Sequence, residues 1–232
     1  MEATEDLFTP IHKALRAMIY SLGNRMQTND FSDLSATTAL VTDLEHDFAL
    51  ARSAGCILCV LHDHADEEER TVFPPVTQFN NGLITTLIEE HHELTRREMA
   101  LAGSAHELLG LSDPAARVRA GGQLNRSAND LFAAYLVHMN REENELVPLM
   151  RRTFTNEQMA AMRATIMGGM PHDRLFAILG WMLPSLNVHE LTELFGGLKK
   201  GAPPEVVKAF ADLASAKVDP TRWKTVASQV GL

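Results

Sequence analysis

Hydrophobic residues recur every three or four positions through the first two thirds of the chain, the spacing that places them on one face of an α-helix. The pattern predicts four long amphipathic helices, over residues 10–26, 34–71, 83–109 and 113–147. The second stretch is too long for one ordinary globular helix, so we expect a break near residues 53–55. Four such helices with short connections predict an all-α fold, an up-down four-helix bundle.

Beyond residue 155 the pattern changes to five short helical segments separated by caps and prolines. Two pairs of residues have the spacing of capping boxes: Thr155 with Gln158, and Asn187 with Glu190. Prolines stand at three expected helix starts: Pro171, Pro203 and Pro220. We therefore predict two parts, a bundle with the metal site over residues 1–152 and a C-terminal helical extension over residues 153–232.

Prolines and glycines add expectations inside the bundle. Pro74 and Pro148 are expected to end the second and fourth helices, because proline lacks the N–H that continues a helix. The pair Gly121 and Gly122 predicts an irregularity within the fourth helix.

Composition and charge narrow the class of protein. The 232-residue chain has a net charge of -9 and no basic stripe, which argues against a nucleic-acid partner. No apolar run approaches the roughly 20 residues that span a bilayer, and the acidic N-terminus does not resemble a secretory signal. We expect a cytoplasmic protein with no membrane partner.

Cys56 and Cys59 form a CxxC sequence within an apolar stretch that has a helical pattern. A redox pair is expected at a helix N-terminus, where a thiolate is stabilised, and a tetrahedral zinc site would need about four ligands. The pattern favours buried core thiols, with a redox or metal role as the alternative.

One polar motif occurs twice, in the second and in the fourth predicted helix. Each copy has a His, a Glu four residues later and a second Glu directly after it: His64, Glu68 and Glu69 in the first, and His138, Glu142 and Glu143 in the second. The four-residue step puts imidazole and carboxylate about 40° apart on one helix face, so both can reach one point beside the helix. A metal ion requires this arrangement.

Each predicted bundle helix carries one inward-facing His: His12, His64, His91 and His138. The alternative interpretation of the Glu clusters is a solvated helix end. Cations rather than carboxylates favour a helix C-terminus, however, so these clusters need positive compensation, which a buried dication would supply. The pattern predicts a metal site between the helices. Two further histidines are expected to be surface or capping groups: His172 and His189.

With these motifs, the chain from about His12 to Pro148 resembles a hemerythrin-like, or HHE cation-binding, domain. Members of that family bind a non-haem di-iron centre between their helices. The resemblance therefore implies two iron ions, bridged by carboxylates and by an oxo or hydroxo group. The implied metal ligands are His12, His64, Glu68, His91, His138 and Glu142.

Two positions depart from the family's oxygen carriers. Those proteins commonly have a second His one turn after the third-helix His, where this chain has Thr95. They also have a carboxylate five residues after the last His, which here would be Glu143 rather than Glu142, so both residues stay open as the last ligand. The implied coordination leaves open positions on both metals, which suits oxidant chemistry or sensing better than reversible oxygen carriage.

The resemblance implies a protein that binds or reacts with dioxygen or a related small oxidant, as a sensor or in oxidative or nitrosative defence. One alternative is an enzyme that turns over peroxide or nitric oxide at the same site. Another is an iron-responsive regulatory protein whose C-terminal helices carry the output, through a protein partner or a homo-oligomer. Outer residues that could orient the imidazoles or move protons are Tyr135, Glu69, Glu143, His92 and Glu90.

Overall fold

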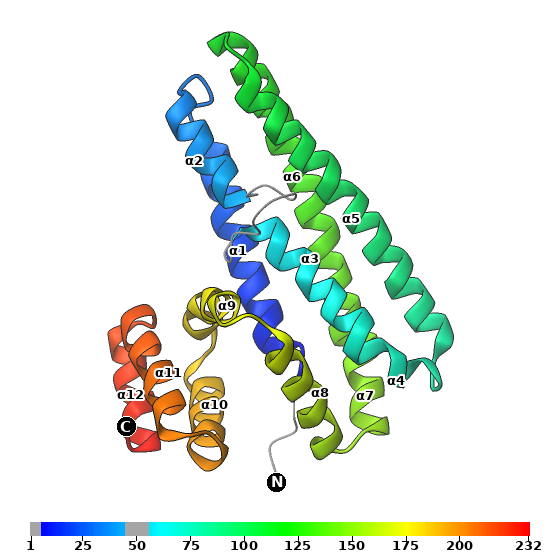
Figure 1. Cartoon of the computed structure of the whole chain (residues 1–232), viewed down its shortest axis with the longest axis vertical. Helices are drawn as coiled ribbons and strands as arrows, with labels where there is room; N and C mark the ends of the chain where they lie inside the picture. The colour runs from blue at the N-terminus through cyan, green and yellow to red at the C-terminus, as the bar shows by residue number, and fades with distance from the viewer. Residues whose placement is uncertain (1–5, 45–55) are drawn as a thin grey trace.

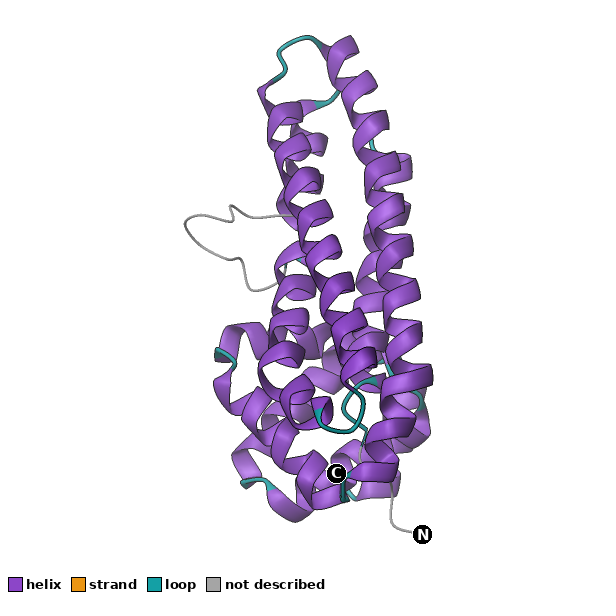
Figure 2. Cartoon of the chain, turned by 90° about the vertical axis from the view of Figure 1, so that its right-hand side faces the viewer, coloured by secondary structure: helices purple, strands orange, loops and turns teal. Residues whose placement is uncertain are grey.

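The computed structural model describes residues 6–44 and 56–232, and its regular secondary structure within those ranges is entirely helical (Figure 2). The helices of the predicted bundle are α1 (Thr9–Thr28), α2 (Leu34–Leu44), α3 (Ile57–Glu67), α4 (Phe73–Thr77), α5 (Asn81–Gly110), α6 (Pro114–Arg141) and α7 (Val147–Thr153). Two π-helical segments, η1 (Glu68–Val72) and η2 (Glu142–Leu146), follow α3 and α6 directly. The all-α prediction is confirmed, while the strict up-down order stays a prediction.

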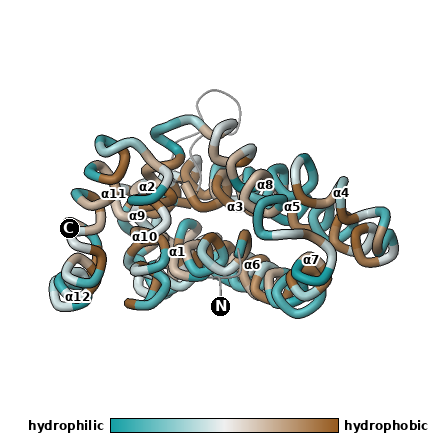
Figure 3. Tube along the Cα trace, turned by 90° about the horizontal axis from the view of Figure 1, so that it is seen from below, coloured by the Kyte–Doolittle hydropathy of each residue, from teal (hydrophilic) through white to brown (hydrophobic). Residues whose placement is uncertain are grey.

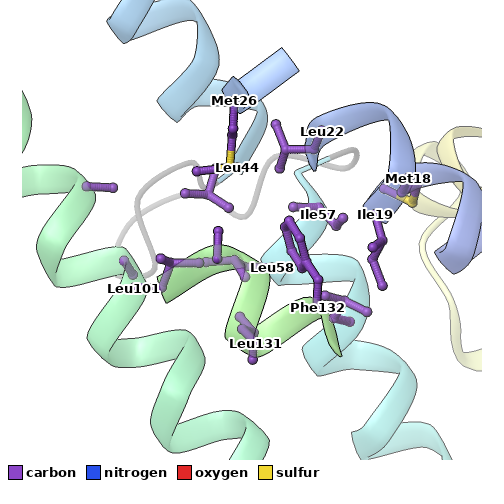
Figure 4. Close-up of a cluster of buried hydrophobic side chains, with 14 of the residues drawn as sticks. Met18, Ile19, Leu22, Met26, Leu44, Ile57, Leu58, Leu101, Leu131 and Phe132 are labelled. Carbon is purple, nitrogen blue, oxygen red and sulfur yellow. The ribbon is translucent and has the colours of Figure 1, made fainter. Parts of the chain in front are cut away.

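The main hydrophobic cluster lies between α1, α2, α3, α5 and α6. Figure 4 shows Ile19, Ile57 and Phe132, from three of these helices, among the side chains that fill it. Hydrophobic and hydrophilic residues alternate along the helices (Figure 3), as expected when each helix turns one face to this interior. The long helices α5 and α6 lie side by side (Figure 1).

A second cluster lies at the other end of the bundle, where η1, η2, α4, α7 and the first turns of α5 meet. It contains Phe8, Phe73, Leu87 and Leu146, and Met159 of α8 (Asn156–Gly169) packs into it. Each helix that carries a predicted ligand thus leads from one apolar cluster into the other. On α5, for example, Leu87 belongs to the second cluster and Leu94 to the first. The polar residues between these positions are enclosed on both sides.

The prediction of an irregularity at Gly121 and Gly122 is wrong, because α6 runs through both residues. A Cβ atom on Gly121 would lie only 2.1 Å from Cγ of Phe31. The glycine therefore serves close packing of an aromatic ring against the helix and produces no break.

The predicted helix ends at Pro74 and Pro148 are also wrong, because α4 and α7 continue beyond these prolines. Each proline falls in the first turn of a new α segment, where its missing N–H leaves no bond unmade. The preceding π segment makes this register available: the backbone N–H of Phe73 donates to the Glu68 carbonyl, and that of Val147 donates to the Glu142 carbonyl, five residues back in both cases.

The expected break near residues 53–55 lies outside the described residues. Helix α3 begins at Ile57, so Cys56 is its N-cap residue rather than a mid-helix residue as predicted. Cys56 and Cys59 are buried, as expected, but they form a disulfide with Cα atoms 5.5 Å apart and are not free thiols. Disulfides are uncommon in cytosolic proteins, so this bond and the expected cytoplasmic location point in different directions.

The C-terminal region consists of α8 (Asn156–Gly169), α9 (His172–Ser185), α10 (Val188–Gly201), α11 (Pro204–Lys217) and α12 (Pro220–Val230). Both predicted capping boxes are confirmed, at the starts of α8 and α10. The expected prolines stand at the starts of α9, α11 and α12. Helices α9–α12 share a third hydrophobic cluster that includes Leu183, Phe195 and Phe210. The boundary between residues 152 and 153 stays a prediction, because α8 packs on the bundle.

None of the helices in the described parts of the chain combines the length and the apolar content that crossing a membrane requires.

Candidate metal centre

The structure brings all six predicted ligands together between the two apolar clusters of the bundle. They form two groups that share both carboxylates: His12, His64, Glu68 and Glu142 in one group, and Glu68, His91, His138 and Glu142 in the other. Within each group one ligand atom from every residue lies within 4.8 Å of the others. The shared Glu68 and Glu142 are 3% and 0% exposed. The arrangement matches a pair of adjacent metal positions joined by two carboxylates.

The inward-facing atoms of this cluster are not satisfied by the protein. Both carboxylate oxygens of Glu68 and of Glu142 are buried without a hydrogen-bond partner, as are Nε2 of His12 and Nε2 of His64. Burying an unpaired polar group is costly, and burying an unpaired charge more so, unless a cation compensates it. These donor types, neutral imidazole and carboxylate, fit a divalent transition metal pair.

The π segments explain how two adjacent glutamates both serve the cluster. In the first motif, Glu68 Oε2 lies 3.3 Å from His91 Nε2, and Glu69 Oε1 lies 2.9 Å from Nδ1 of the same ring. The second motif treats His12 in the same way: Glu142 Oε2 is 3.3 Å from Nε2 and Glu143 Oε1 is 2.9 Å from Nδ1. One glutamate of each pair therefore faces the interior, and the other holds the outer side of an imidazole from another helix.

His138 is held in the same manner by a residue of α5, with Glu90 Oε2 2.8 Å from His138 Nδ1. A carboxylate can only accept at this position, so the Nδ1 atoms of His12, His91 and His138 carry the donated proton. The inward Nε2 atoms then present lone pairs. This is the tautomer that a metal-binding imidazole needs, fixed by the contact on its outer side.

Two of these inward-facing nitrogen atoms lie close to each other. Nε2 of His91 lies 2.8 Å from Nε2 of His138. At this distance either one nitrogen donates a proton to the other or both lone pairs face a shared cation.

Arginines hold the outer carboxylates in turn. Arg16 Nη1 donates to Glu143 Oε1 at 2.7 Å, and Arg141 Nε lies 2.9 Å from Glu90 Oε1. Hydrogen bonds from His12, and then from Arg16, lower the pKa of Glu143 to about 2, so this glutamate is a charged acceptor across the neutral pH range. Sequence reasoning did not find these arginines, because they stand on the outer helix faces, where most arginines are solvated.

The pKa values of the two central carboxyl groups, Glu68 and Glu142, are shifted in opposite directions. Burial, and then the charge of Glu142, raise the pKa of Glu68 well above its usual value. Burial also acts to raise the pKa of Glu142, but its close contacts with the imidazoles of His12 and His138 outweigh burial and hold that pKa well below its usual range. Burial lowers the pKa of His64 well below its usual value, so this imidazole is neutral and available to a metal ion.

The other polar residues singled out in the sequence take different places. Tyr135 is buried one turn before His138, but its hydroxyl donates to Glu98, a fully buried carboxyl that sequence reasoning missed. His92 is exposed and so does not support the cluster as expected. The predicted surface position of two histidines is confirmed, for His172 and His189. Glu98 has a signal in retrospect, since it stands seven residues after His91 and therefore on the same helix face.

The family model for the hemerythrin HHE cation binding domain matches residues 4–150. Comparison with curated proteins and with solved structures gives no match. The match covers well over half of the chain, including every residue of the cluster described above. The chain belongs to the hemerythrin HHE cation-binding family.

Proposed function

We propose that this protein is a non-haem di-iron protein that binds or reacts with dioxygen or a related small oxidant, as a sensor or in oxidative or nitrosative defence. His12 and His64 would hold one iron, His91 and His138 would hold the other, and Glu68 and Glu142 would contact both. This assignment favours Glu142 over Glu143 as the last ligand.

One observation carries the proposal: the carboxylate oxygens of Glu68 and Glu142, and Nε2 of His12 and His64, are buried without a hydrogen-bond partner. A bundle interior that only served stability would have apolar residues or internally paired polar groups at these positions. None of the surrounding imidazoles donates a hydrogen bond to these carboxylate oxygens. A pair of cations would satisfy both kinds of atom together.

The residues of the chain have three tasks in this proposal. Glu69, Glu90 and Glu143 hold the Nδ1 protons and so aim three imidazoles inward. The apolar clusters on either side limit the access of water. A bound iron pair would supply the redox chemistry with the small oxidant, which amino-acid side chains alone cannot provide.

The test is metal analysis and absorption spectroscopy of protein loaded anaerobically with ferrous iron. We expect about two iron ions per chain and a new absorption band when oxygen is admitted. Glu68→Ala should lose both metals, whereas Lys208→Gln, which removes an exposed ion pair with Asp212, should bind as the unaltered protein does. Failure of the unaltered protein to bind iron would contradict the proposal.

A second candidate is an iron-responsive regulatory protein whose C-terminal helices carry the output. It is favoured by the packing of α9 along α1, the helix that carries His12. Turnover of peroxide or nitric oxide is the third reading, and steady-state consumption of either compound by the iron-loaded protein would distinguish it.

A further inference from the structure

Helix α9 attaches the last four C-terminal helices to the bundle beside α1. Helix α9 lies beside α1 (Figure 1), and Ile178 of α9 belongs to the main core cluster of the bundle. The same region has its own hydrophobic cluster between α9 and α12. The C-terminal helices are therefore a packed unit with a defined attachment.

Two ion pairs strengthen this attachment, and both lie beside predicted ligands. Lys13 Nζ donates to Glu190 Oε1 at 2.5 Å, and Lys13 directly follows His12. Arg174 Nη1 lies 2.6 Å from Asp63 Oδ2, and Asp63 directly precedes His64.

The two ion pairs differ in burial, but in each of them the residue from the C-terminal helices is held in place by its surroundings. The Arg174 side chain is only 7% exposed, so its charge depends on Asp63 for compensation. Glu190 also accepts through Oε2 from the backbone N–H of Asn187, so the capping box at the start of α10 holds the carboxylate that contacts Lys13. Both ion pairs are therefore anchored on elements with fixed positions, and neither is a loose surface contact.

His12 and His64 belong to the same group of ligands, whereas His91 and His138 come from α5 and α6. We propose that Arg174 and Glu190 are positioning residues, through which the C-terminal helices set the metal affinity of the His12/His64 half of the site. The inference rests on the proposed metal binding. It adds that the two metal positions are unequal and that one of them is coupled to the docking of α9 and α10.

The physical reason is the rigidity of a helix. Lys13 and Asp63 are each one residue, about 1.5 Å along the axis, from a ligand, so a shift of either helix moves the contact and the imidazole together. Docking of α9 and α10 fixes α1 relative to α3, which is the separation that a metal held by His12 and His64 needs. By thermodynamic linkage, a metal in that half must stabilise the docking to the same extent.

The test is a titration of the metal-free full chain with Co²⁺, followed by absorption and by calorimetry, which resolves two binding steps. Arg174→Gln and Glu190→Gln should each weaken one step by about fivefold or more, the usual lower range of coupling between sites, and should leave the other step unchanged. Glutamine at position 190 still suits the capping box, so that variant isolates the contact with Lys13. Arg174→Lys should restore part of the affinity, because it keeps the charge.

Matched variants identify the steps. Arg141→Gln acts on Glu90 and hence on His138, so it should weaken the other step. Lys208→Gln, which breaks an ion pair inside α11, should change neither step. If Arg174→Gln does not fold, the Co²⁺ titration of Lys13→Gln tests the inference instead. Lys13 is half-buried, so its replacement leaves no buried charge unpaired.

Two results would overturn the inference in distinguishable ways. If the unaltered protein binds two Co²⁺ ions but the Arg174 and Glu190 variants shift both steps equally, or neither, the C-terminal helices do not act on one half and the proposed metal binding stands. If the unaltered protein binds no Co²⁺, the proposed function fails and the inference fails with it.

Discussion

The adjacent residues Glu142 and Glu143 allow the sharpest test of the site geometry, because their surroundings are opposite. Glu142 is fully buried, and neither of its oxygens has a hydrogen-bond partner. The Glu143 side chain is 30% exposed, and its Oε1 accepts from His12 Nδ1 and from Arg16 Nη1. Replacing either residue by Gln keeps its size and removes its charge. The two variants should therefore have very different effects on metal binding.

The magnitudes follow from the position of each residue relative to the metal. Glu143 acts only by orienting His12, and loss of such an outer contact typically lowers metal affinity by about 10- to 100-fold, or roughly 1.4 to 2.7 kcal/mol. Only the metal position that uses His12 should be affected. Glu142 belongs to both ligand groups. Its replacement should therefore weaken both positions, each by more than about 100-fold, since a ligand contributes more than its outer support.

Titration of the metal-free variants with Co²⁺, followed by absorption, measures both steps. Glu107→Gln on the exposed face of α5 is the matched control and should behave as the unaltered protein does. The reasoning is refuted if the order reverses, so that Glu143→Gln abolishes both steps while Glu142→Gln retains them. That result would identify Glu143 as the ligand, as in the alternative left open by the sequence.

Three further predictions address stability, protons and packing. Metal at about 100 times its Kd should stabilise the fold by about 2.7 kcal/mol, which raises Tm by roughly 5 to 11 °C for a chain of this length. Calorimetry of the protein with Co²⁺ and after chelation measures this shift, and an unchanged Tm would count against a buried site. Metal binding should release protons and strengthen with rising pH around and above pH 6.5. The close contacts with the Glu142 carboxylate outweigh burial and raise the pKa values of His12 and His138, and a protonated Nε2 cannot bind metal. Calorimetry in buffers of different ionisation heat detects the released protons, and equal heats would contradict this prediction. Gly121→Ala should destabilise the fold by about 1–3 kcal/mol, because the added Cβ collides with the Phe31 ring. Gly122→Ala, where a Cβ would lie 3.8 Å from Arg126, should be neutral or stabilising by up to about 1 kcal/mol. Equal denaturation midpoints for the two variants would show that the Phe31 ring moves aside.

The convergence of the six ligands could be predicted because it depends only on helical periodicity. His64 with Glu68, and His138 with Glu142, are each one turn apart, so any helix that turns its apolar face inward brings both groups along. The choice between Glu142 and its neighbour could not be predicted in this way. It depends on the π segment, whose wider turn changes the direction of each side chain from that expected in a regular α-helix.

The π segments also account for the wrong predictions at Pro74 and Pro148. Proline ends a helix when its ring meets the carbonyl four residues back, and the sequence alone gives no reason to expect otherwise. A wider turn immediately before each proline removes that conflict. The same turn directs Glu68 and Glu69 to the two sides of the His91 ring. Pro74 and the glutamate pair therefore both depend on this π segment.

The two sequence motifs are nearly identical, yet their surroundings make the two halves of the site unequal. In both motifs the first glutamate faces the interior and the second supports an imidazole from another helix. The symmetry ends there, because the contacts of α9 and α10 fall beside His12 and His64. A duplicated motif accounts for two proposed metal positions, but it does not account for a difference between them. Any difference in affinity must therefore come from residues outside the motifs, and Arg174 and Glu190 are two charged residues of the C-terminal helices that make contacts beside this half of the site.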